Sequence, residues 1–148
     1  MTDWRKVWGR ARKTARWAVT MTKVRIRKTI TKTRWQLVTF VGAQGGESVG
    51  IIDLLAIRKD HSPGRAGLKR GDLFEVVLIQ VKGGSAPFPS ADEITRLRLV
   101  GIAYNAKAIL LAQWRKGTAA TFYRLERPGS FEEGADWKRL DSLAEVFH

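Results

Sequence analysis

Polar side chains interrupt two apolar stretches of this sequence. Residues 50–57 read Gly-Ile-Ile-Asp-Leu-Leu-Ala-Ile, and residues 73–82 read Leu-Phe-Glu-Val-Val-Leu-Ile-Gln-Val-Lys. Short apolar runs rich in β-branched residues are typical of buried strands. Asp53 lies inside the first run, whereas Gln80 and Lys82 end the second. Because an unpaired charge is costly to bury, we expect these side chains to meet each other, a metal ion or a substrate phosphate.

Strand geometry supports a meeting of these three residues. Side chains two positions apart share one face of a strand, so Gln80 and Lys82 point the same way. If the two runs pair as an antiparallel hairpin around the loop at residues 58–72, Asp53 lies roughly opposite residues 77–80. The pairing predicts one cluster on neighbouring strands.

An acidic residue in an apolar strand, followed on the next strand by Gln-x-Lys, resembles the motif of the PD-(D/E)XK nucleases, which have the restriction-endonuclease-like fold. The segments at residues 50–56 and 79–82 look most similar to Mrr-type endonucleases and Holliday-junction resolvases, and the resemblance covers residues 35–125. It implies an α/β fold with a mixed central sheet of about five strands in the order β-β-β-α-β-β, flanked by helices. It also implies a DNA endonuclease, either selective for junctions or of the restriction type. The alternative is a non-catalytic nucleic-acid-binding domain of the same fold.

The resemblance further assigns roles to individual residues. Asp53 would be the main ligand of Mg²⁺ or Mn²⁺, joined by the Gln80 amide and the Val81 backbone carbonyl. A hard cation neutralises the charge that develops on a phosphodiester and lowers the pKa of an attacking water, and Lys82 would stabilise charge beside it. Gln80 is neutral where many members carry Glu, so a second acid, Glu47 or another, must supply the missing charge. Dimers are common in that family, which makes a homodimer a further expectation.

Two other carboxylates and a histidine are interpreted as structural. Glu75 lies five residues before Gln80, which puts it on the opposite face of the strand and about 16 Å away. The segment Ser90-Ala91-Asp92-Glu93 is a capping box, in which Glu93 serves the start of a helix. His61 lies in the long loop between the two runs and is interpreted as a loop residue.

The rest of the chain predicts helices on both sides of a strand-rich middle. Hydrophobic spacing favours a helix over residues 3–19 and either a strand or an extended basic arm over residues 23–34. The other expected elements are strands at 35–41, 50–57, 73–82, 106–114 and 120–125, a helix from the Ser90 cap to Asn105, and a closing helix at 136–147. The expected organisation is a basic, Trp-rich helix and arm at 1–34, and a nuclease-like core with a C-terminal helix at 35–148.

Positive charge is concentrated near the N-terminus. The formal net charge is +13, and residues 1–35 hold twelve basic residues against one acidic residue, Asp3. Such a field favours a polyanion, nucleic acid first and an anionic membrane surface second. DNA is therefore the expected partner, RNA is not excluded, and a membrane role ranks last. The residues expected to contact nucleic acid are Arg5, Lys6, Arg12, Lys13, Arg16, Arg25, Arg27, Lys28, Arg65, Lys69 and Arg70.

The predicted helix at residues 3–19 allows two interpretations. Trp4, Trp8 and three alanines recur at helical spacing and would pack on the domain as the apolar face of an ordinary amphipathic helix. In the other interpretation the helix lies on DNA phosphates or on a membrane interface.

The composition limits other chemistries. The chain has no cysteine and two histidines, so thiolate and zinc sites and Ser-His or Cys-His nucleophiles lack their residues. The glycine-rich stretch at 42–48 is not followed by the lysine and serine of a nucleotide-binding loop, and no small-molecule cofactor is expected. No apolar run reaches the length of a membrane span, so a cytoplasmic, nucleoid-associated protein is the expectation.

Overall fold

The structure is a computed structural model, and it describes residues 3–40, 49–115, 117–126 and 136–148, with the backbone alone for residues 8–15. In chain order the elements are α1 (Trp4–Ile30), β1 (Gln36–Thr39), β2 (Leu54–Lys59), β3 (Phe74–Gly83), α2 (Ala91–Ala103), β4 (Ala108–Trp114), β5 (Thr121–Leu125), β6 (Trp137–Arg139) and the 3-10 turn η1 (Leu143–Glu145). The predicted α/β class with a mixed sheet is confirmed. Within the described residues the sheet has six strands rather than about five.

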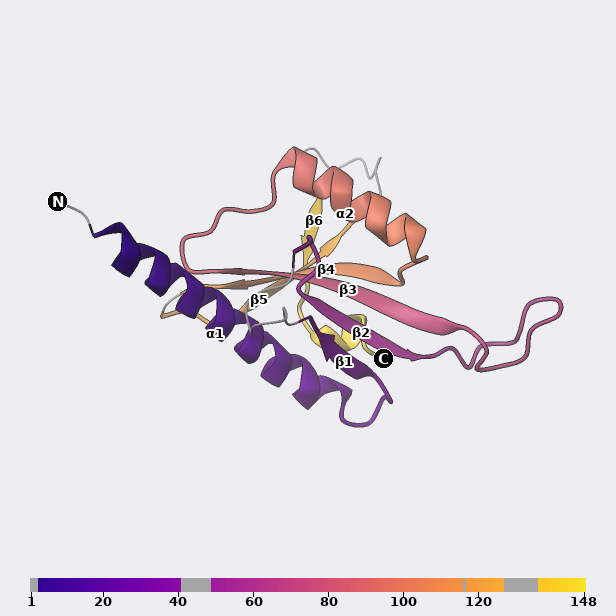
Figure 1. The fold of residues 1–148 in the computed structure, drawn as a ribbon. Helices are drawn as coiled ribbons and strands as arrows, with labels where there is room; N and C mark the ends of the chain where they lie inside the picture. The colour runs from indigo at the N-terminus through magenta and orange to yellow at the C-terminus, as the bar shows by residue number, and fades with distance from the viewer. Residues whose placement is uncertain (1–2, 41–48, 116, 127–135) are drawn as a thin grey trace.

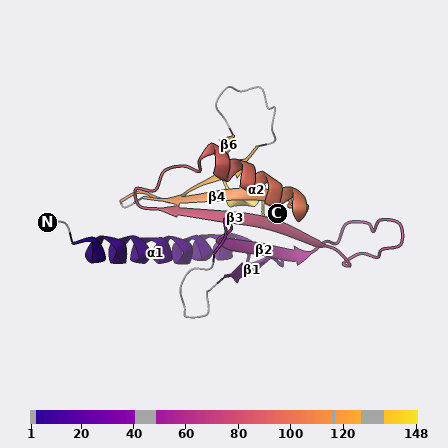
Figure 2. The ribbon, with the colours of Figure 1, turned by 45° about the horizontal axis from the view of Figure 1, so that its top comes forward.

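The strands follow chain order across the sheet, from β1 at one edge to β6 at the other. Neighbouring strands are antiparallel except β3 and β4, which are parallel. A parallel pair needs a crossover connection, and α2 supplies it. Figures 1 and 2 show α1 and α2 on opposite faces of the sheet. The chain therefore leaves β3 toward the face that α2 covers, and the end of β3 faces the start of that helix.

Helix α1 is longer than the predicted helix at 3–19 and replaces the strand or arm expected at 23–34. Its buried stripe recurs every four residues and consists of Ala18, Thr22, Ile26 and Ile30. This spacing keeps one helix face on the sheet. The alternation of Val24 and Ile26 with basic residues is compatible with a strand over a few residues, and only the longer stripe identifies the helix.

A buried hydrogen bond ties α1 to the sheet. The Trp114 indole N–H donates to the Thr22 hydroxyl at 2.6 Å, and this hydroxyl donates to the Ala18 carbonyl at 2.7 Å. Thr22 is fully buried, and its hydroxyl is both donor and acceptor. Trp17 adds an edge-on ring contact to Trp114 at 5.4 Å.

The packing interpretation of the predicted N-terminal helix does not hold for Trp4, which is 67% exposed. The side chain of Trp8 lies outside the described residues. Among the side chains of α1 that the structure describes, those buried against the sheet lie in its C-terminal half.

The main core lies between α1 and the sheet. Ile26 and Ile30 pack with buried side chains of the central strands and of the C-terminal segment, among them Leu54, Val77, Ile79, Leu110, Phe122, Leu143 and Phe147. Phe147 also lies edge-on to Trp35 at 5.5 Å. The opposite face of the sheet is covered in part by α2, whose buried residue is Leu97. The end of β3 faces this second, thinner layer.

The closing helix expected at 136–147 is wrong for the described residues. Residues 137–139 pair with β5 as β6, and the chain then makes only the η1 turn, capped by Ser142. Leu140, Leu143 and Phe147 are buried, as their spacing suggested. Pairing with the open edge of β5 satisfies the backbone of this segment, and this tertiary contact overrides the helical spacing.

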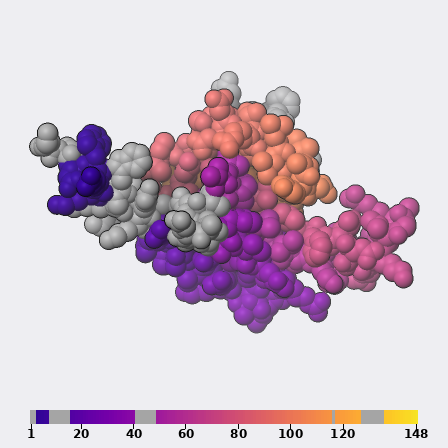
Figure 3. Space-filling view, in the orientation of Figure 1, coloured from indigo at the N-terminus to yellow at the C-terminus, as the bar shows by residue number. Residues whose placement is uncertain are grey.

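Strands β2 and β3 form the predicted antiparallel hairpin, with a register from Leu54–Ile79 to Lys59–Phe74. Backbone hydrogen bonds of 2.8 Å, from Asp60 to Leu73 and from Gly71 to Asp60, close the base of the connecting loop. The loop at residues 60–73 projects from the body of the molecule (Figure 3).

Candidate active site

Asp53 lies immediately before β2 rather than inside it, and it is anchored to β3. Its backbone N–H donates to the Ile79 carbonyl at 3.0 Å, and its carboxylate accepts the Val81 N–H at 2.7 Å. One step beyond the Leu54–Ile79 pair, the register places Asp53 across from Gln80. Since the N–H and carbonyl of a residue face the same neighbouring strand, the Val81 carbonyl also lies on the Asp53 side of β3.

Gln80 and Lys82 meet at one carboxylate oxygen. The Gln80 Nε2 donates to Glu93 Oε2 at 3.2 Å, and the Lys82 Nζ lies 3.1 Å from the same oxygen. Gln80 is 5% exposed, and Lys82 and Glu93 are half-buried. The first turn of α2 therefore closes over the end of β3, and Gln80 and Lys82 both face it.

Glu93 is the residue whose second role the sequence analysis missed. The predicted capping box is present, because Ser90 and Glu93 each bond the other's backbone N–H. The other carboxylate oxygen is free to point at Gln80 and Lys82. A usable signal was the position of this acid, in the first turn of the helix that directly follows the strand carrying Gln-x-Lys.

Gln113 is another buried polar residue that the sequence analysis did not single out. It lies in β4 opposite Lys82 and is 7% exposed, and its Nε2 has no hydrogen-bond partner within the described residues. The signal was the same as for Gln80, a glutamine inside an apolar strand.

The surroundings of Glu93 favour its charged form. Partial burial raises the pKa of Glu93, but the hydrogen bonds from Lys82, Ser90 and Gln80 outweigh burial and hold the pKa below its ordinary value of 4.5. The carboxylate is therefore ionised at neutral pH, where it pairs with the Lys82 ammonium.

Glu93→Gln should lower the free energy of unfolding at neutral pH by about 1 kcal/mol, because a half-exposed ion pair and one charged hydrogen bond are weakened. A lowered pKa in the folded state stabilises the fold above pH 4.5, and this contribution is lost as the pH falls through the folded-state pKa. Urea unfolding of both proteins at decreasing pH should show their difference shrinking below pH 4.5. Asp92→Asn is the control, since it removes an acid from the same helical turn. A difference that is independent of pH would contradict the assignment.

The donor set at the end of β3 fits a hard cation. The Gln80 Oε1 is buried and has no hydrogen-bond partner within the described part of the chain, which is unusual for a buried amide oxygen. Three more oxygen donors belong to neighbouring residues. Glu93 accepts a hydrogen bond from the Gln80 side chain, Val81 follows Gln80 in the strand, and Asp53 accepts the Val81 N–H. Oxygen ligands of this kind suit Mg²⁺. No group of three or more His, Cys, Asp or Glu suited to a metal occurs among the described residues, and Glu47 lies outside them.

Glu75 lies apart from this cluster. Its carboxylate pairs with Arg58 at 2.5 Å and with Lys107 at 3.8 Å. The Arg58 guanidinium also lies over the Trp35 ring, 4.3 Å from its centroid. Glu75 therefore lies on the face of the sheet opposite Gln80 and Lys82, and its ion pairs support the interpretation of Glu75 as a structural residue.

The basic residues expected to contact nucleic acid lie mostly on the surface. On α1 the exposed ones are Arg5, Lys6, Arg16, Arg25, Arg27 and Lys28, and on the 60–73 loop they are Arg65, Lys69 and Arg70. Lys6 is 3.9 Å from Asp3, and Arg70 donates to the His61 carbonyl at 2.7 Å. The side chains of Arg12 and Lys13 lie outside the described residues.

Comparison with known proteins shows similarity to solved structures but not to sequences or family models. No family model matches the chain, and no curated protein matches its sequence. Among solved structures, the chain is similar to Hjc, a Holliday junction resolvase from the archaeal hyperthermophile Archaeoglobus fulgidus. The two chains are 19% identical, the match covers 86% of this chain and 90% of the resolvase chain, and the TM-score is 0.41. At this TM-score the similarity assigns no family, substrate or residue role. Separately, none of the described helices has both the length and the apolar character needed to cross a bilayer.

Proposed function

We propose that this protein is a metal-dependent endonuclease of the restriction-endonuclease-like fold, which hydrolyses phosphodiester bonds in DNA. The observation that supports the proposal is the buried Gln80 Oε1, which has no hydrogen-bond partner among the described residues. Its side chain donates to Glu93, as Lys82 does, and Gln80 lies across from Asp53 in the strand register. Burying such an oxygen without a partner costs about 1–3 kcal/mol, and a cation coordinated by the oxygen would remove this cost.

Each residue has a role in the proposed site. Asp53 and Glu93 supply negative charge, and Gln80 and the Val81 carbonyl supply neutral oxygen donors. Mg²⁺ or Mn²⁺, when bound, would act as a Lewis acid and lower the pKa of a bound water. Lys82 would stabilise negative charge on the phosphate. Glu93 makes up the carboxylate that Gln80 lacks, which is the role proposed from the sequence for Glu47.

The second candidate function is a nucleic-acid-binding domain without catalysis. The 3.1 Å pair between Lys82 and Glu93 favours it, because these two charges already satisfy each other. In this case the exposed basic residues of α1 would bind DNA, and the end of β3 would serve only stability.

The two functions are separated by incubating the purified protein with branched and linear DNA, in Mg²⁺ or Mn²⁺ and in EDTA. The endonuclease proposal expects products only with a divalent cation. Salt-sensitive binding without products under any divalent cation would leave the binding domain as the function.

Gln80→Glu should raise the apparent affinity for Mg²⁺ by about tenfold, because the variant adds a carboxylate to the proposed ligand set. In EDTA the same change should destabilise the fold, because the new carboxylate replaces a donor to Glu93. Thermal unfolding during a Mg²⁺ titration measures both effects. Gln36→Glu adds the same charge on exposed β1 and serves as the control. Equal Mg²⁺ responses of the two variants would remove Gln80 from the ligand set.

A further inference from the structure

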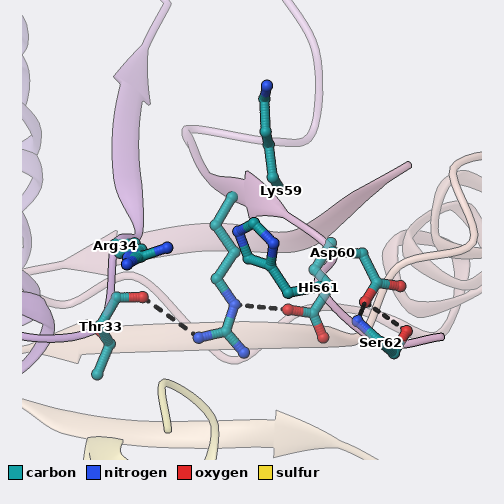
Figure 4. A pocket seen from close by; sticks show the side chains of 8 residues that line it. Thr33, Arg34, Lys59, Asp60, His61 and Ser62 are labelled. Atoms are coloured by element: carbon teal, nitrogen blue, oxygen red, sulfur yellow. Dashed lines mark hydrogen bonds and ion pairs between the residues drawn. The ribbon is translucent and has the colours of Figure 1, made fainter. Parts of the chain in front are cut away.

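Two adjoining hollows lie where the chain enters β1 and leaves β2. Their volumes are about 330 Å³ and 380 Å³, and both are lined by Arg34, Arg58, Lys59 and His61. The second extends to Phe74, and we name the two together the Arg34–Phe74 groove. In Figure 4, Thr33 and Arg34 lie on one side of the first hollow, Asp60 and Ser62 lie on the other, and the His61 ring lies between them.

The acidic residues of this groove are already engaged. Glu75 is paired with Arg58 at 2.5 Å and with Lys107 at 3.8 Å. Asp60 accepts the hydroxyl and backbone N–H of Ser62 at 2.5 and 2.9 Å. These hydrogen bonds hold the pKa of Asp60 below its ordinary value. Glu75 is therefore neutralised by its two ion pairs, whereas Asp60 keeps its charge on the Ser62 side of the first hollow. The second hollow is lined by Arg34, Arg58 and Lys59 and, among the described residues, by no carboxylate.

The remaining cations are Arg34 and Lys59. Both are exposed, and neither has an ion-pair partner among the residues that the structure describes. Arg34 also has a φ of 60°, in the left-handed region that favours glycine and asparagine. A long cationic side chain at such a position carries a conformational cost, and costs of this kind gather at ligand-binding positions.

An exposed aromatic ring completes the groove. Phe74 is 57% exposed and lies directly opposite Lys59 in the β2–β3 register. A cation beside an accessible aromatic face is the arrangement that binds single-stranded nucleic acid, since the cation takes the phosphate and the ring stacks on a base.

The groove crosses the end of the hairpin: Arg58 and Glu75 line it on one sheet face, whereas Phe74 lies on the face of the candidate active site. Phe74, Gln80 and Lys82 are separated by even numbers of residues within β3, so their side chains share a face. At strand rise, Phe74 and Gln80 are about 20 Å apart. One nucleic-acid strand could follow the hairpin from one site to the other.

We propose that the Arg34–Phe74 groove binds an unpaired nucleotide of a nucleic-acid strand. The phosphate lies between Arg34 and Lys59, and the base stacks on Phe74. Binding at the groove is independent of catalysis, whereas a substrate that reaches both the groove and Asp53 rests on the proposed endonuclease function.

The test is fluorescence anisotropy of a labelled oligothymidylate of about eight nucleotides with the full chain in EDTA. Phe74→Ala should weaken binding by about tenfold, whereas Phe74→Trp keeps a stacking surface and should bind as the wild type does. Arg34→Asn should also weaken binding without lowering the melting temperature, because asparagine tolerates the left-handed backbone. Tyr104→Ala removes an aromatic residue that is also exposed, at the end of α2, and is the matched control.

Wild-type affinity in Phe74→Ala, or an equal loss in Tyr104→Ala, would overturn the groove as a nucleotide site. Because EDTA prevents divalent-dependent cleavage, the result does not depend on the endonuclease proposal. If the protein binds oligothymidylate through Phe74 but never cuts DNA, the groove proposal stands and the endonuclease proposal fails. If the protein cuts DNA but its binding of oligothymidylate does not depend on Phe74, the endonuclease proposal stands and the groove proposal fails.

Discussion

Asp53→Asn should abolish divalent-dependent cleavage while leaving DNA binding intact or slightly tighter. Asparagine keeps the size of the side chain and an oxygen that can accept the Val81 N–H, which the Asp53 carboxylate accepts at 2.7 Å. It removes the negative charge that would hold the cation beside the phosphate. Losing about 4 kcal/mol of charge stabilisation corresponds to roughly a 1000-fold slower rate. Repulsion between the site and the DNA phosphate also falls, which explains the expected gain in binding.

Three measurements make this prediction specific. Initial cleavage rates are compared at saturating Mg²⁺, DNA affinity is measured in EDTA, and thermal unfolding verifies that the variant is folded. Cleavage by the variant at the wild-type rate would remove Asp53 from the chemistry. A large loss of melting temperature would show that the hydrogen bond to Val81 stabilises the hairpin. The lower cleavage rate of the variant could then not be attributed to lost metal binding.

Replacing four exposed basic residues of α1 by glutamine should weaken DNA binding by about 1000-fold at 0.15 M salt, if each contacts one phosphate. The residues are Arg16, Arg25, Arg27 and Lys28. Each phosphate contact contributes about 0.9 to the slope of log affinity against log salt, so the slope should become shallower by roughly three to four units. A salt series of binding isotherms with duplex DNA measures both quantities.

The control carries the same change in net charge at another surface. Arg96, Arg115, Lys138 and Arg139 are exposed and lie on α2, in the β4–β5 turn and in β6. Their replacement by glutamine should lower binding far less, because only non-specific attraction is reduced. Equal losses in the two variants would mean that net charge, rather than the helix, attracts the DNA.

The hairpin and the start of α2 could be predicted from the sequence because their signals are local. β-branched runs mark β2 and β3, and the capping box is complete within the four residues 90–93. The partner of Glu93 could not be predicted in this way. It depends on how the crossover returns over β3, and the spacing of residues in the chain does not contain that geometry.

Both ends of the chain show the opposite case, in which tertiary contacts decide the conformation. The basic stretch after residue 22 is helical because a stripe ending at Ile30 packs on the sheet. The C-terminal segment carries helical spacing but pairs with β5. In both segments the buried apolar residues could be identified from the sequence, whereas their backbone conformation depends on what they pack against.

The hydrogen bond between Trp114 and Thr22 has a consequence on the outside of the molecule. Moving α1 along its axis by one residue would turn every side chain by about 100° around that axis. The buried threonine can meet the indole N–H at only one azimuth, and that azimuth directs Arg16, Arg27 and Lys28 to solvent. The direction in which the helix presents its positive field is thus fixed from inside the protein, by a neutral contact that carries no charge of its own.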